Sequence, residues 1–151
     1  MIPTVPNNLG FNMYFPSLLA LGLASTALGQ VTPPAGYRKV YITSNVNAKF
    51  VVEPKTPVKA GVQLVVNTLA NKPSQQWWLQ NGKTRIQLVD TTLCIDAGAK
   101  ANWKDMARLT LSECAETVDG QKFEVKADGR IAVDLSAAPR MFFSLLRASY
   151  S

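Results

Sequence analysis

The sequence predicts a small all-β protein, and this prediction depends on three observations. Short runs of β-branched and aromatic residues recur along the chain, separated by polar or Gly/Pro segments. No helical pattern of three turns occurs outside the N-terminal region. The third observation is an internal repeat, described below. With 151 residues, the chain has room for one domain with a core of its own.

The expected strands fall into two sets of four. The first set covers residues 38–44, 49–52, 62–66 and 76–80, and the second covers 85–89, 93–96, 108–112 and 122–126. β-Branched and aromatic side chains of this kind suit a pleated, half-buried surface. Two dipeptides, Asn81-Gly82 and Asp128-Gly129, favour tight hairpin turns between strands.

The chain repeats its own pattern when it is shifted by 45 residues. The tripeptide 76–78 (QWW) then falls on 121–123 (QKF), and Ile86 falls on Ile131. The expected units are residues 41–85, 86–130 and a partial third unit, 131–151. Four strands per unit, repeated around an axis, predict a small all-β barrel or trefoil.

The N-terminal residues 1–29 have the pattern of a secretory signal peptide. Residues 15–28 are apolar and uncharged, and the small residues Ala27 and Gly29 precede Gln30 at the −3 and −1 positions of a cleavage site. The apolar stretch is shorter than the roughly 20 residues that a membrane-spanning helix needs. Because residues 1–14 lack Lys and Arg, Met13 is an alternative start to Met1. We expect a secreted, extracellular domain over residues 30–151, without a membrane span.

Secretion determines how the two cysteines are interpreted. Cys94 and Cys114 are the only cysteines, and in an oxidising compartment they are expected to form a disulfide. The chain contains no histidine, which removes Ser–His and Cys–His nucleophile systems and most metal-hydrolase chemistry. We therefore expect no metal site, no cofactor and no enzymatic activity.

The charge pattern argues against a nucleic-acid partner. The formal net charge is +6, but the 16 Lys and Arg residues are scattered, and acidic residues interleave with them after Asp90. A nucleic-acid arm or a polybasic membrane patch would need a basic run or stripe, and none is present.

The second unit resembles one repeat of a ricin B-type (R-type) β-trefoil lectin. The resemblance is carried by four segments in order, namely 93–96 (LCID), 109–114 (LTLSEC), 121–123 (QKF) and 128–131 (DGRI). The family pattern is a Cys-x-Asp, a strand ending at a second Cys, a Gln-x-Trp and a turn leading to an Ile. The resemblance is good over about 50 residues, weaker over 38–84, and is lost after about residue 135.

The resemblance assigns structural roles to one pair of residues in each unit. Gln121 and Phe123 match the Gln-x-Trp motif in the second unit, and Gln76 and Trp78 supply the same signature in the first. In this family the aromatic side chain points into the shared core and the Gln satisfies backbone groups at a turn. These residues are therefore expected to build the fold.

Sugar binding in the family depends on other positions. Asp96 matches the carboxylate that accepts hydrogen bonds from sugar hydroxyls. Ser112 stands where an aromatic platform is expected, and Gly120 stands where a polar residue, often Asn, precedes the Gln-x-Trp. In the first unit the 45-residue shift places Val51 opposite Asp96, so the carboxylate is expected to be missing there.

Trp103 is a possible substitute for the missing platform. It lies in the loop 98–106, where it either packs on the flank of the barrel, the more ordinary interpretation, or folds over Asp96. Asn102, next to it, is a candidate sugar-binding residue, although a turn role is the more common one for Asn.

The third unit is expected to be incomplete, because the pattern changes after Leu135. Residues 141–146 are expected to form either a short amphipathic helix or a strand that fills the open side of the barrel. Without such an element, open strand edges would favour self-association. The expected function is a secreted, non-catalytic carbohydrate-binding module, for glycans of the galactose or N-acetylgalactosamine type. The alternative is a trefoil that has lost sugar binding and contacts a protein partner, as trefoil protease inhibitors do.

Overall fold

The computed structural model describes residues 31–104, 107–134 and 143–150. The expected signal segment, 1–29, lies outside these residues. The strands are β1 (Arg38–Ser44), β2 (Phe50–Pro54), β3 (Leu64–Thr68), β4 (Gln76–Leu79), β5 (Gly82–Thr84), β6 (Gln87–Leu88), β7 (Leu93–Asp96), β8 (Thr110–Glu113), β9 (Phe123–Val125), β10 (Arg130–Val133) and β11 (Phe143–Tyr150). The helices described are three 3-10 turns, η1 (Pro73–Gln75), η2 (Lys100–Asn102) and η3 (Asp119–Gln121). The all-β prediction is confirmed.

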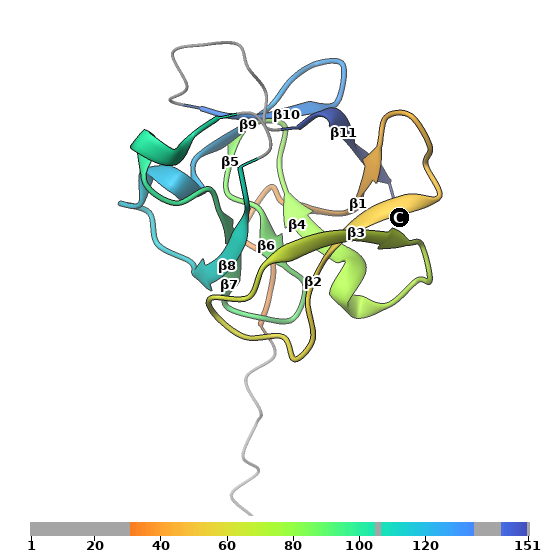
Figure 1. The fold of residues 1–151 in the computed structure, drawn as a ribbon, viewed down its shortest axis with the longest axis horizontal. Helices are drawn as coiled ribbons and strands as arrows, with labels where there is room; N and C mark the ends of the chain where they lie inside the picture. Colours follow the sequence, from red (N-terminus) through yellow and green to blue (C-terminus); the bar gives the residue numbers. More distant parts are fainter. Residues whose placement is uncertain (1–30, 105–106, 135–142, 151) are drawn as a thin grey trace, which may run out of the picture.

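The strands form one antiparallel sheet that curls into a nearly closed barrel (Figure 1). Its order runs β5-β9-β10-β11-β1-β4-β6-β7-β8. β5 and β6 are consecutive pieces of one chain segment, interrupted at residues 85 and 86. The strand order that begins at β5 therefore returns to the same chain segment when it reaches β6. Of the expected strand 85–89, only residues 87–88 form a strand, β6, and β5 lies before the expected range. The expected strands 38–44 and 93–96 coincide with β1 and β7.

β11 is the strand that was expected as one of two ways of filling the open side of the barrel in the third unit. It pairs with β1 on one side, from Val40↔Tyr150 to Ser44↔Leu146, and with β10 on the other. Of the two conformations expected near the C-terminus, the strand is the one found. β11 therefore occupies the edges of β1 and β10, and unpaired edges of this kind are what promote pairing with other chains.

Two hairpins, β2–β3 and β7–β8, extend from the barrel and lie against each other (Figure 1). The backbone N–H of Leu64 donates to the carbonyl of Leu109 at 2.9 Å, and the N–H of Leu111 donates to Val62 at 2.9 Å. The disulfide Cys94–Cys114 is present, as expected, and joins β7 to the residue that follows β8. The hairpins are thus fixed to each other by backbone hydrogen bonds, and the second one is also cross-linked covalently.

The hydrophobic core lies inside the barrel, and both units contribute to it. Trp77 from β4 and Phe123 from β9 are its largest fully buried side chains. Around them lie aliphatic residues from the other strands: Val40, Ile42, Val52, Leu79, Ile86, Leu88, Leu93, Ile95, Leu111, Val125, Ile131 and Val133. The indole N–H of Trp77 donates to the carbonyl of Val52 at 3.1 Å, so its polar atom is satisfied inside the core.

The β2–β3 hairpin has no disulfide, and an apolar pair occupies its place. Val51 pairs with Asn67 as Cys94 pairs with Ser112, which makes Val51 the counterpart of Cys94. The backbone N–H of Leu69 donates to the carbonyl of Lys49, which lies two positions before Val51. In the same way, the backbone N–H of Cys114 donates to the carbonyl of Thr92, two positions before Cys94. Val51 is fully buried. The two hairpins therefore have the same backbone arrangement but different side chains at the cross-link position.

Replacing both cysteines, as Cys94→Ala with Cys114→Ala, is expected to lower the free energy of unfolding by about 2–4 kcal/mol, because the cross-link restricts the unfolded chain. Urea unfolding followed by tryptophan fluorescence measures this change. Reduction of the wild-type protein should lower the midpoint similarly and should leave the double variant unaffected. An unchanged midpoint in the double variant would contradict a stabilising disulfide.

Candidate functional site

Asp96, the predicted sugar-binding carboxylate, is the last residue of β7 and is half-buried. Its Oδ1 accepts a hydrogen bond from the backbone N–H of Gly98 at 2.7 Å. Its Oδ2 lies 3.4 Å from the side-chain amide Nε2 of Gln121, which donates to it. The carboxylate is therefore held in one orientation by a turn on one side and by a buried amide on the other.

Gln121 ends the 3-10 turn η3 and is almost completely buried. Its Oε1 accepts from the backbone N–H of Ala115 at 2.9 Å, and its Nε2 donates to the carbonyl of Glu113 at 2.9 Å. A buried amide needs hydrogen-bond partners, and here they come from the last residue of β8 and from the chain just after it. The expected role of Gln121, satisfying backbone groups at a turn, is confirmed.

The first unit contains the same arrangement around Gln75. Its Oε1 accepts from the backbone N–H of Ala70 at 2.8 Å, and its Nε2 donates to the carbonyl of Thr68 at 2.9 Å. The same Nε2 donates to a carboxylate oxygen of Glu53 at 2.8 Å. Gln75 also ends a 3-10 turn, η1, and is fully buried. We call this set of contacts, a buried Gln holding a carboxylate and two backbone groups, the glutamine bracket.

The bracket corrects the sequence register in the first unit. Gln75 and Trp77, not Gln76 and Trp78, occupy the places of Gln121 and Phe123. Gln76 is half-buried and donates its Nε2 to the hydroxyl of Tyr41 at 3.1 Å, and Trp78 is buried but lies outside the core cluster. The adjacent Gln-Gln and Trp-Trp pairs made both registers compatible with the motif. The span from Ala115 to Gln121 in the second unit is one residue longer than the span from Ala70 to Gln75 in the first. A shift without a gap therefore aligned Gln121 with Gln76 in place of Gln75.

The expected absence of a carboxylate in the first unit is also wrong. Glu53 pairs with Val65 in its hairpin as Asp96 pairs with Thr110, so Glu53 is the counterpart of Asp96. The span from Asp96 to Thr110 exceeds that from Glu53 to Val65 by two residues, which a fixed shift cannot accommodate. An acidic residue two positions after the apolar Val51 was the signal that could have identified it.

The two carboxylates differ in accessibility. Glu53 is only 8% exposed, and its second oxygen accepts from the side-chain amide of Asn67 at 2.7 Å. Asp96 is half-buried, and Ser112, the counterpart of Asn67, does not hydrogen-bond to it in the described structure. The first bracket is therefore closed by its own side chains, whereas the carboxylate of the second is accessible from solvent.

Gly120 permits the close approach of the Asp96 turn. A Cβ at this position would overlap Asp96 Oδ1 and would lie 2.7 Å from the carbonyl oxygen of Gly98. The carbonyl of Gly120 also accepts from the backbone N–H of Ala97 at 2.8 Å. The polar side chain that the lectin family places here would therefore have no room beside the turn.

Trp103 is attached to the same turn. Its indole N–H donates to the carbonyl of Gly98 at 3.0 Å, and its half-buried ring packs against the core cluster. The ordinary interpretation, a loop Trp packed on the barrel flank, is thus correct, although the ring also borders the Asp96 turn. Asn102 is exposed at the end of η2, where its backbone N–H bonds to Ala99, and no hydrogen bond described in the structure joins it to Asp96.

The comparisons with known proteins give no assignment. No protein-family model matches the chain, and no curated protein sequence matches it. Over the described ranges, no helix is long and apolar enough to cross a membrane. Within those same ranges, no group of three or more His, Cys, Asp or Glu side chains is arranged to hold a metal ion.

Gln75→Leu is expected to destabilise the protein by about 1–3 kcal/mol or more, because it leaves the buried Glu53 carboxylate and two backbone groups without their partner. The matched control Gln76→Leu removes a half-buried amide and should change stability by less. Thermal and urea unfolding of both variants measure the difference. Equal losses in the two variants would contradict the assignment of the bracket to Gln75.

Gly120→Ala is expected to cost about 1–3 kcal/mol, because a methyl group must push the backbone of Gly98 away from η3. Ser74 occupies the corresponding position in η1, so Ser74→Ala is the matched control and should have a small effect. Urea unfolding compares the two variants. A Gly120→Ala protein as stable as the Ser74→Ala protein would show that the contact between η3 and the Asp96 turn is not tight.

Proposed function

We propose that this chain is a secreted, non-catalytic carbohydrate-binding module with a ricin B-type β-trefoil architecture. Three features support the proposal: the nearly closed antiparallel barrel, the two units with equivalent hairpins, and the disulfide within the second hairpin. Secretion is supported by that disulfide and by the sequence pattern of residues 1–29, because disulfides persist in oxidising compartments.

The trefoil part of the proposal rests on how the units contribute strands. The first unit supplies β1 and β4 to the barrel and β2–β3 as a hairpin. The second begins at β5 and not at residue 86 as expected, because Lys83 and Thr84 pair with β9 as Lys39 and Val40 pair with β4. It supplies the β5/β6 segment and β9 to the barrel and β7–β8 as a hairpin. The third supplies β10 and β11 to the barrel. Six barrel segments from three units, with hairpins attached to the first two, are what a trefoil with a shortened third unit would have.

The observation that carries the binding proposal is the second glutamine bracket. An ionised carboxylate has about four lone-pair positions, and Asp96 uses one on each oxygen for Gly98 and Gln121. The remaining lone pairs can accept hydrogen bonds from two neighbouring sugar hydroxyls. Such charge-assisted hydrogen bonds are stronger than neutral ones, and the fixed carboxylate loses little freedom on binding.

Trp103 would supply the apolar part of the contact. Its ring is anchored to Gly98 and keeps part of its surface exposed beside the Asp96 turn. Aromatic faces provide a large apolar area at a small entropic cost. In this proposal Trp103 performs the role that the lectin family gives to the residue at position 112. The expected ligands are glycans of the galactose or N-acetylgalactosamine type.

Asp96→Asn is expected to reduce retention on a galactose or N-acetylgalactosamine matrix by about tenfold or more, because it removes the charge that strengthens the hydroxyl contacts. Asp90→Asn is the matched control, since Asp90 is exposed, and its positive φ of 58° suits Asn as well as Asp. Affinity chromatography followed by a glycan array measures the effect. Absence of wild-type binding, or equal binding by the two variants, would contradict the proposal.

A second candidate function is a protein-interaction module, including the protease-inhibitor type. It is favoured by the lack of room at Gly120 for the polar side chain that lectins of this family use. It is also favoured by two exposed apolar side chains of the β2–β3 hairpin, Phe50 (43% exposed) and Val66 (58%). A protease-inhibition assay with Phe50→Ser tests this candidate. Inhibition that is lost in this variant, together with no glycan binding by the wild type, would favour it over the first.

A further inference from the structure

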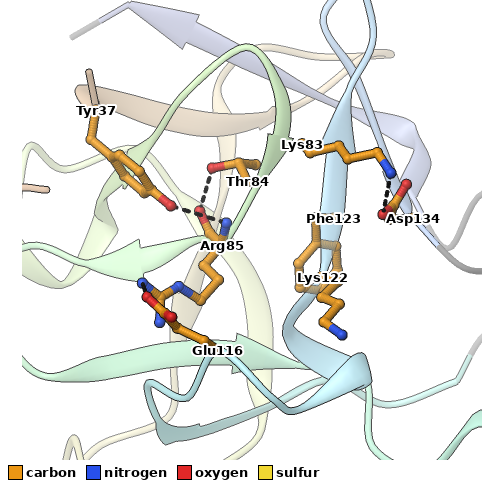
Figure 2. A pocket seen from close by; sticks show the side chains of 8 residues that line it. All are labelled: Tyr37, Lys83, Thr84, Arg85, Glu116, Lys122, Phe123 and Asp134. Carbon is orange, nitrogen blue, oxygen red and sulfur yellow. Dashed lines mark hydrogen bonds and ion pairs between the residues drawn. The ribbon is translucent and has the colours of Figure 1, made fainter. Parts of the chain in front are cut away.

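A pocket of about 300 Å³ lies at one end of the barrel, where β5 and β10 end and β9 begins. Figure 2 shows that side chains from distant parts of the chain surround it. Its charged lining consists of Lys83, Arg85 and Lys122, with Glu116 and Asp134, and the hydroxyl of Tyr37 faces the backbone of Arg85. The volume is at the lower end of the range for small-molecule sites, which suits a ligand the size of one sugar ring.

The cations of the pocket are paired to different degrees. Lys83 lies 3.2 Å from Asp134, and Lys122 lies 2.7 Å from Asp119, which does not line the pocket. Arg85 is 3.6 Å from Glu116, the longest of these ion pairs. The Arg85 side chain is only 25% exposed, whereas that of Glu116 is 86% exposed. A pair this long with one fully solvated partner contributes little to stability, so Glu116 is easily exchanged for another anion.

The first unit provides an internal comparison for this pocket. The pairing Lys83↔Glu124 and Thr84↔Phe123 corresponds to Lys39↔Trp78 and Val40↔Trp77. By this register, Arg85 corresponds to Tyr41, and Lys122 corresponds to Gln76. Glu116 corresponds to Asn71, because each is the third residue after the end of its hairpin.

The corresponding cluster in the first unit is neutral and closed by hydrogen bonds. The hydroxyl of Tyr41 donates to Asn71 Oδ1 at 3.2 Å and accepts from Gln76 Nε2 at 3.1 Å. The second unit has replaced these neutral groups by Arg, Glu and Lys, and it has a pocket there. The charges at these three positions are thus specific to the second unit, whereas Lys83 has a lysine, Lys39, as its counterpart in the first.

We propose that this pocket binds the carboxylate of a hexuronate, an acidic sugar unit, through Arg85. The ligand carboxylate would replace Glu116 on the guanidinium, and Lys122 and Lys83 would add to the favourable potential. Tyr37 accepts the backbone N–H of Arg85 at 3.2 Å, which leaves its own hydroxyl hydrogen to donate to the ligand. The choice of a sugar rests on the proposed carbohydrate-binding function, whereas the choice of a carboxylate rests on the pocket alone.

The charges in the pocket favour a carboxylate over a doubly charged anion. Its lining carries three cationic and two anionic side chains, a net charge of one. Glu116 and Asp134 would repel a dianion such as a phosphate monoester. The planar guanidinium of Arg85 presents parallel N–H groups that match the two oxygens of a carboxylate.

The test is titration calorimetry of the full chain with galacturonate, galactose and galactose 6-phosphate at low ionic strength. We expect galacturonate to bind at least tenfold more tightly than galactose, and more tightly than galactose 6-phosphate. Arg85→Gln should abolish this preference, whereas the control Arg108→Gln, outside the pocket lining, should retain it. Glu116→Gln should increase galacturonate affinity severalfold, because it removes the competing carboxylate.

The increase in Glu116→Gln keeps the test decisive even if Arg85→Gln fails to fold. Equal affinities for galacturonate and galactose, tighter binding of galactose 6-phosphate, or no gain in Glu116→Gln would each overturn the proposal. Asp96→Asn separates it from the proposed function. Galactose binding that depends on Asp96, without any galacturonate preference, would leave the lectin proposal standing and remove this one. A galacturonate preference that survives in Asp96→Asn would support a site distinct from the Asp96 turn.

Discussion

The buried amides of Gln75 and Gln121 hold each hairpin to the barrel strand that follows it. The core aromatic residues and both proposed binding sites are positioned by these two amides. Each glutamine ends a 3-10 turn and binds the last carbonyl of the hairpin, one backbone N–H just after it and one carboxylate within it. Two residues later, Trp77 or Phe123 enters the core. Because a buried amide without partners is costly, the bracket fixes the phase of the following strand. A shift by one residue would move the aromatic side chain from the core to the outside.

The same brackets set the positions of both proposed binding sites in the second unit. The residue before Gln121 is Gly120, against which the Asp96 turn packs, and the residue after it is Lys122, which lines the charged pocket. In the first unit the counterpart of Asp96 is the buried Glu53, and the counterpart of Lys122 is Gln76, which belongs to a neutral hydrogen-bonded cluster. The two units thus share a backbone arrangement, while at these positions the second carries the solvent-accessible charges. That unit is also the one whose hairpin is cross-linked by the disulfide.

The class of fold and several strands could be predicted from the sequence, because they depend on local patterns. β1 and β7 coincide with their expected ranges, and the disulfide followed from there being two cysteines in an expected secreted chain. The roles of Gln75 and Glu53 could not be derived with a fixed shift, because loop lengths differ between the units by one and two residues. Adjacent Gln-Gln and Trp-Trp pairs removed the local signal that would have revealed the slip. The charged pocket was missed because its cations are far from one another in sequence and form no basic run.

The position of β11 has a consequence for the order of folding. Val40 pairs with Tyr150, so one side of β1 is covered only by a segment more than 100 residues further along the chain. During synthesis both hairpins and the β1–β4 contacts can form before that segment leaves the ribosome, but the barrel cannot close. Non-local strand pairing is slow because a long loop must be closed first. The nascent protein therefore passes through a stage in which β1 and β10 present open edges, and this is the stage at which it is most exposed to aggregation.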